Sequence, residues 1–218
     1  MGTIERRIIK IPAEKLSGVD HMFGRMINMD TEKLPAKFQS AFEKTKEAAY
    51  QNFRMEAVFE SFKVERIEGD SIHLENGVVL NSRLMAEVFC QSFELVFAVT
   101  TLHGYEALDE AEENILLKLF LDSWGTALIE CGNQWVEQNV AKELEDKEIY
   151  ATHSFSPGQN DIPMEMQTQI FQAISPKEIG VTLNDRYMMH PKKSVSGIFG
   201  IQTEKIENRI RPCDICER

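Results

Sequence analysis

The chain has 218 residues, of which 43% are hydrophobic, and this length can bury a sizeable core as one domain. Its 35 acidic and 24 basic residues give a net charge of −11; such a surface is repelled by phosphate backbones, so we expect no nucleic-acid partner. No stretch reaches the roughly 18–20 uncharged apolar residues that a membrane helix needs, and residues 1–10 lack a signal-peptide pattern. We therefore expect a cytoplasmic protein with no membrane contact.

The first third of the chain predicts a strand, a helix and a hairpin. Isoleucines in residues 4–11 predict a strand that Pro12 ends. Residues 34–50 repeat apolar side chains at helical spacing with charges between them, which predicts an amphipathic helix. Residues 53–64 alternate imperfectly and fit either element. Residues 72–80 contain two β-like pieces around an Asn-Gly pair, which suits a tight hairpin turn.

The middle and end of the chain mix further strands and helices. Residues 93–102 (FELVFAVTTL) are nearly continuous in aromatic and β-branched side chains, as in a strand buried on both faces. Two helices follow, predicted over residues 109–122 and 123–144, and both carry apolar repeats. Another helix is predicted over residues 163–174, with a proline in its first turn. Shorter strands are predicted at residues 150–155, 179–183 and 195–201.

These elements follow no regular β-α-β rhythm, which favours an α+β fold with a largely antiparallel sheet. No linker, repeat or low-complexity segment divides the chain, so we expect one domain over residues 1–202. A charged tail follows at residues 203–218. It carries Cys213 and Cys216 in a CxxC pair, which in a reducing compartment fits a dithiol or half of a metal site better than a structural disulfide.

Residues that usually carry catalysis form no recognisable pattern. Motifs of nucleophile elbows, phosphate-binding loops, zinc proteases and dinucleotide-binding folds are all missing, and the five histidines are scattered without ligand spacing. Cys90 and Cys131 stand among apolar residues, so we expect both to be buried. Two thiolates fill only half a tetrahedral metal site, so Cys213 and Cys216 would need a second chain. The sequence therefore predicts no catalytic residue.

Two segments differ from ordinary core or surface. Residues 153–163 place small residues, two prolines and a glycine between a strand and a helix. Such a loop can present a helix N-terminus to a carboxylate or phosphate, or it can be a plain turn capped by Asp161. Residues 188–200 combine a Met-Met pair, a basic turn and a Gly-flanked strand. They suit the border of a large flat ligand, or a loop that enters an edge strand.

Together these segments resemble a known family. The pattern SPGxxDxPxxxQxxIF, then IGVTLN, then MMxPKKSVSGIFGI, is similar to the activation domain of cobalamin-dependent methionine synthase, above all to its stand-alone members. Upstream, TTLHG at residues 100–104 and DSWGTALIE at residues 122–130 resemble further elements of the family in the same order. The resemblance covers about residues 90–202.

The resemblance implies a single α+β unit with a twisted antiparallel sheet and flanking helices. It implies binding of S-adenosylmethionine in a shallow groove and docking on a corrinoid protein, with cobalamin held by that partner. The implied role is reductive remethylation of oxidised cobalamin, with electrons from a flavodoxin-like or iron–sulfur donor. A stand-alone chain would act in trans on a truncated cobalamin-dependent methionine synthase or another corrinoid methyltransferase.

The resemblance also predicts the site and shows where this chain departs from it. The family motif is an arginine, three residues, then Gly-Tyr; here Ser154 replaces the arginine and Gln159 the tyrosine, while Gly158 is kept. Serine lacks the planar fork with which arginine binds a carboxylate. Glu130 matches an acidic position near the ligand's ammonium, or is an ordinary helix-surface glutamate. The predicted cofactor-binding residues are Glu130, Ser154, Phe155, Ser156, Pro157, Gly158, Gln159, Met189, Pro191, Ser194, Ser196 and Gly197.

Two functional hypotheses therefore compete. In the first, the chain binds S-adenosylmethionine and supports remethylation of a corrinoid methyltransferase. In the second, it keeps the fold and the corrinoid-protein partner but has lost the cofactor. A metal or redox role for Cys213 and Cys216 is a third, weaker reading.

Overall fold

The structure, a computed structural model, describes residues 3–145 and 147–205. The strands in these residues are β1 (Arg7–Ile11), β2 (Arg54–Glu68), β3 (Ser71–Leu74), β4 (Val79–Asn81), β5 (Glu94–His103), β6 (Tyr150–Ala151), β7 (Thr182–Leu183), β8 (Met189–His190) and β9 (Ser194–Gln202). The helices are α1 (Val19–Ile27), α2 (Ala36–Asn52), α3 (Arg83–Val88), α4 (Tyr105–Ala111), α5 (Ile115–Glu145) and α6 (Gln167–Ile174). The predicted α+β class is confirmed.

A twisted antiparallel sheet organises these elements. Within the described residues its strands run in the order β4-β3-β2-β5-β9-β6, and β1 pairs with β2 beside this path. β5 lies at the centre, and residues 94–102 are all buried, as their nearly continuous apolar run predicts. The ambiguous segment after Phe53 is a strand, because β2 pairs with β5 from Arg54 to Lys63.

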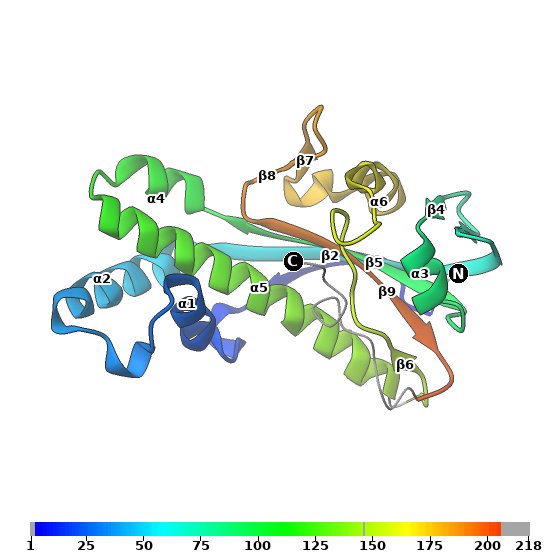
Figure 1. The fold of residues 1–218 in the computed structure, drawn as a ribbon, viewed down its shortest axis with the longest axis horizontal. Helices are drawn as coiled ribbons and strands as arrows, with labels where there is room; N and C mark the ends of the chain where they lie inside the picture. The colour runs from blue at the N-terminus through cyan, green and yellow to red at the C-terminus, as the bar shows by residue number, and fades with distance from the viewer. Residues whose placement is uncertain (1–2, 146, 206–218) are drawn as a thin grey trace.

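Helices cover both faces of the sheet (Figure 1). Because successive strand residues point to opposite faces, Val96 and Ala98 of β5 join one core with α1, α2 and α5. Phe97 and Val99 join a second core with α3 and α6. We call these two sides the α5 face and the α6 face of the sheet. Every residue of the candidate site lies on one side or the other.

The prediction of two helices between residues 109 and 144 is wrong. One continuous helix, α5, runs from Ile115 to Glu145. The Asn114 side chain caps it by accepting hydrogen bonds from the Leu116 and Leu117 amides. Gly125 and Gly132 lie inside it rather than at a break. A Cβ on Gly125 would stand 3.2 Å from both the Tyr105 ring and the Lys193 side chain, so this glycine permits close packing. Tertiary burial therefore outweighs the roughly 1 kcal/mol that each helical glycine costs.

Three smaller expectations also need correction. Cys90 is exposed, because α3 ends at Val88 and the cysteine follows in a turn; only Cys131 is buried. The strand predicted over residues 150–155 keeps ladder pairing at Tyr150–Ala151 alone, and Phe155 adds an isolated bridge to Ile198. Helix α1 was not predicted. Cys213 and Cys216 lie outside the described residues, so the predicted tail stays a prediction.

The packing of Trp124 in the core on the α5 face predicts how much stability its removal costs. Trp124 is fully buried, its ring stacks on Phe23 with centroids 4.2 Å apart, and its indole N–H donates to Thr45. Trp124→Ala should lower the free energy of unfolding by about 3–5 kcal/mol in urea titrations, because it leaves a large cavity. Trp135 is only half-buried, so Trp135→Ala is the matched control and should cost less than half as much. Equal losses would contradict this packing.

Candidate functional site

A line of polar residues follows one side of the otherwise apolar α5. Asp122, Thr126, Glu130, Asn133 and Glu137 recur at spacings of four, four, three and four, which places them on one side of the helix. Most of their neighbours on α5 are buried in the core. Polar groups this close to a core need hydrogen-bond partners. Two segments, one before and one after the turn region, supply them to Asp122, Thr126 and Glu137, and Thr100 of β5 supplies one to Asn133.

The first segment runs from β6 to the turn at Pro157. Phe155 exchanges both backbone hydrogen bonds with Ile198 of β9, and its side chain is buried on the α6 face. Because side chains alternate along an extended segment, Ser154 points to the α5 face. There its hydroxyl donates to the Glu137 carboxylate. Gly197 of β9 permits this approach, since a Cβ at that position would overlap the Ser154 hydroxyl.

Glu137 is the most perturbed carboxyl of this group. Its pKa is raised to about 7, chiefly by burial and further by the negative charge of Glu130; hydrogen bonds from Ser154 and Asn133 oppose this shift only in part. The Asn133 amide lies 2.8 Å from the carboxylate, and its carbonyl oxygen accepts from Thr100 at 3.3 Å. Burial also raises the pKa of Glu130. No Lys or Arg of the described residues forms an ion pair with either glutamate.

The second segment enters β9 and is held by a charged clamp. Lys193 Nζ lies 2.7 Å from Asp122 and 2.8 Å from Thr126, and it stands over the Tyr105 ring. The Tyr105 hydroxyl donates to the same Asp122 oxygen at 2.7 Å. Burial and this hydrogen bond raise the pKa of Tyr105 well above its ordinary value, so the hydroxyl keeps its proton and donates it. The clamp therefore fixes the start of β9 against the first turns of α5.

The turn that follows Phe155 is closed by its own side chains. Ser156 and Gln159 bracket a Pro-Gly pair, and Gly158 has a φ of +88°, as the third position of a type II turn requires. The Gln159 side chain accepts from the Ser156 amide at 2.9 Å. Asp161 does not cap the helix that follows it. Its carboxylate instead accepts from the first amides of α3 and from Ser82, so the loop is tied to α3.

The predicted site residues therefore fall into two groups. Ser154 and Gly197 meet on the α5 face, and Glu130 lies on α5 two turns before Glu137, whose pKa its charge raises. The remaining residues lie in the turn, on the α6 face or, for Pro191, between β8 and β9. Their serine hydroxyls are used in packing: Ser194 donates to the Pro191 carbonyl, Ser196 to Gln167, and Ser156 to the Ser196 carbonyl. These remaining residues are Phe155, Ser156, Pro157, Gly158, Gln159, Met189, Pro191, Ser194 and Ser196.

Sequence reasoning missed two members of the polar line. Asn133 and Glu137 follow Glu130 by three and seven residues, a spacing that puts all three on one helical side. That spacing was visible in the sequence. The prediction overlooked it because the motifs of the resemblance end at Glu130.

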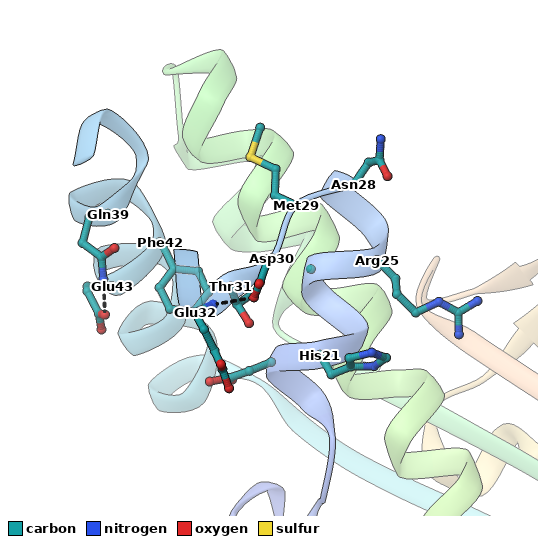
Figure 2. A pocket seen from close by; sticks show the side chains of 12 residues that line it. His21, Arg25, Asn28, Met29, Asp30, Thr31, Glu32, Gln39, Phe42 and Glu43 are labelled. Atoms are coloured by element: carbon teal, nitrogen blue, oxygen red, sulfur yellow. Dashed lines mark hydrogen bonds between the residues drawn. The ribbon is translucent and has the colours of Figure 1, made fainter. Parts of the chain in front are cut away.

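An open hollow of about 760 Å³ lies elsewhere, between α1, the turn at Thr31–Lys33 and α2 (Figure 2). Two of its side-chain hydrogen bonds are local: Gln39 donates to Glu43, and Asp30 accepts from the Glu32 amide (Figure 2). Asp20 is paired with Lys46 at 2.6 Å. The hollow shares no lining residue with the polar line of α5, and we do not assign it a ligand.

Comparisons with known proteins support the fold. No protein-family model matches the sequence, and no curated protein matches it. Among solved structures, the crystal structure of the MetH reactivation domain bound to AdoHcy matches with a TM-score of 0.69. The match covers 94% of this chain and 81% of that chain at 16% sequence identity. The chain therefore has the fold of the MetH reactivation domain.

No three His, Cys, Asp or Glu side chains of the described residues are grouped so that they could hold a metal ion. No helix in residues 3–145 or 147–205 is long and apolar enough to cross a membrane.

The raised pKa of Glu137 predicts a pH-dependent stability. Between its ordinary pKa of 4.5 and about 7, the folded protein holds a proton that the unfolded chain releases. Stability therefore falls as pH rises through this window, by at most about 3 kcal/mol at 1.36 kcal/mol per unit. Glu137→Gln removes this loss, so the variant should gain stability relative to the parent between pH 5 and pH 8.

Urea titrations at both pH values measure the difference. Glu145→Gln, an exposed position on the same helix, is the control and should change stability equally at both. A Glu137→Gln effect that is the same at pH 5 and pH 8 would contradict the burial of this carboxyl.

Proposed function

We propose that this chain is a stand-alone accessory protein of the reactivation-domain type. It docks on a corrinoid methyltransferase, such as a truncated cobalamin-dependent methionine synthase, and supports reductive remethylation in trans. The observation that carries this proposal is the likeness of nearly the whole chain to the MetH reactivation domain bound to AdoHcy. The order of the motifs over residues 90–202 supports it independently.

The ligand in this proposal is an adenosyl sulfonium of the S-adenosylmethionine type. When bound, it supplies an activated methyl group, and the corrinoid is held by the partner. Glu130 and Glu137 fit the ligand's ammonium and sulfonium charges, because both are carboxylates at the edge of a buried face. No arginine stands at position 154 to hold the ligand's carboxylate. The residues present thus fit the cationic groups of this ligand and not its anionic one.

The protein's own groups bind and orient rather than transfer protons. Asn133 and Ser154 fix the Glu137 carboxylate from two directions. The Lys193–Asp122 clamp fixes the β9 entrance about four turns earlier on α5. Electrons would come from a flavodoxin-like or iron–sulfur donor. A cytoplasmic setting fits this role.

A second candidate function keeps the docking and drops the ligand. Two observations favour it: Gln159 closes its own turn, and Ser154 is committed to Glu137, so neither serves as the ligand-binding residue of the motif. Under this candidate the chain recognises its corrinoid protein through surface complementarity alone.

Docking itself can be tested without any small ligand. Sedimentation velocity with the cobalamin-binding fragment of a cobalamin-dependent methionine synthase should show a 1:1 complex with a Kd of about 1 μM or below, roughly 8 kcal/mol of binding. A corrinoid-free globular protein of similar size is the control and should not associate. If the two proteins sediment independently at 50 μM, roughly fifty times that Kd, the corrinoid role is wrong.

A further inference from the structure

Another open hollow, of about 540 Å³, lies on the α6 face and shares no lining residue with the polar line of α5. One of its walls is the β3–β4 hairpin between Asn76 and Asn81, and Gln169 and Gln172 of α6 form the other. Its volume lies within the range of small-ligand sites, about 300–1,000 Å³. None of its lining residues is a matched letter of the motifs in residues 90–202, so the resemblance assigns it no role.

The lining of this hollow is rich in carboxamides. Four of its nine described residues are Asn or Gln, and none of the nine is charged, in a chain of which 27% of residues are charged. Phe62, Val78, Val79 and Ala173 supply apolar surface. An ion that entered would lose hydration without gaining a lining group of opposite charge. The net charge of −11 disfavours anions further, so the hollow suits an uncharged ligand.

The hairpin wall offers hydrogen-bond donors. The Asn76 side-chain oxygen accepts from the Val78 amide at 3.1 Å, and the Asn81 oxygen accepts from the Ser71 hydroxyl at 2.8 Å. Both carbonyl oxygens are thus engaged within the hairpin. The two NH2 groups, with two hydrogens each, are what this wall presents to a ligand.

The α6 wall offers an acceptor. Gln169 donates both amide hydrogens to carbonyls of the preceding turn, that of Met166 at 3.2 Å and that of Glu165 at 3.0 Å. Its carbonyl oxygen therefore remains for a ligand. Gln172 follows three residues later on the same side of α6, and its amide can turn to donate or to accept. Donors on one wall thus stand opposite an acceptor on the other.

We propose that this hollow binds a small uncharged ligand through a primary carboxamide. In that group a carbonyl acceptor and an NH2 donor diverge within one plane, so the carbonyl accepts from Asn76 and Asn81 while the NH2 donates to Gln169. A carboxylate brings only acceptors and would set a negative charge against the Gln169 oxygen. A sugar spreads hydroxyls around its ring and would place some of them against the apolar lining. This site is independent of the proposed function.

NMR titrations of the ¹⁵N-labelled full chain at pH 7 test this with a matched pair of probes. Nicotinamide and nicotinate share the pyridine ring, and the first has a carboxamide where the second has a carboxylate. Nicotinamide should shift the side-chain NH2 signals of Asn76 and Asn81 with a Kd of about 1 mM or below, the range of a small fragment. Nicotinate should bind at least about tenfold more weakly, as expected for one unmet hydrogen bond.

Asn81→Asp replaces the NH2 donor by an acceptor of the same shape and keeps an oxygen for Ser71. It should weaken nicotinamide binding at least about tenfold. Asn184→Asp is the matched control, because the oxygen of this exposed asparagine also accepts local hydrogen bonds, at 2.9 and 3.0 Å, and the exchange adds the same charge. This control should leave the Kd unchanged.

Equal binding of the two probes overturns the polarity of the walls and with it the inference. The inference also fails if Asn81→Asp binds nicotinamide like the parent, or if no signal shifts at 20 mM nicotinamide, roughly twenty times the expected Kd. Glucose at the same concentration should leave these signals in place. Tighter binding of glucose than of nicotinamide would assign the hollow to sugars and overturn the carboxamide. The sedimentation experiment decides the docking role separately.

Discussion

The hydrogen bond from Ser154 to Glu137 joins the edge of the sheet to the long central helix. A carboxylate beside the core on α5 is costly unless its oxygens are paired, and the pairing comes from two directions, the helix itself and the strand edge. The arrangement needs a glycine at position 197, because any side chain there would fill the space of the serine hydroxyl. The position of α5 along the sheet, the approach of residues 152–155 to β9 and the charge of the site are thus coupled.

Side chains alternate along β9, so the residues of the family-like motif point to both faces of the sheet. Gly197 faces α5, whereas Ser196 faces α6 and binds the buried Gln167. Ser156 and Ser194 bond to backbone carbonyls near the ends of the same stretch. Most of the residues that make the resemblance recognisable therefore hold β9, the turn and the β8–β9 connection in place, and few of them are available to a ligand. A motif of this kind predicts a fold more firmly than it predicts contacts.

Local sequence patterns predicted the elements that depend on neighbouring residues alone, such as a strand buried on both faces or a tight turn. The run at residues 93–102 is the central strand because a strand buried on both faces needs no polar positions, and the Asn-Gly pair forms its hairpin. The extent of α5 was misjudged, because its glycines serve packing against Tyr105 and Met55, which local sequence does not reveal. Cys90 was misjudged for a similar reason: its exposure depends on where α3 ends. In the site, Glu130 and Ser154 were predicted singly, but their relation through Glu137 depends on the tertiary fold.

A ¹³C NMR titration of the labelled glutamate carboxyls measures most directly whether Glu137 is a half-buried carboxyl with a raised pKa. We expect a midpoint for Glu137 at about 7 in the free protein. We also expect this midpoint to fall by at least about one unit when a saturating cationic ligand is added, since a nearby positive charge favours the ionised form. A free-protein midpoint at the ordinary glutamate value of 4.5 that does not move with ligand would contradict the raised pKa of Glu137.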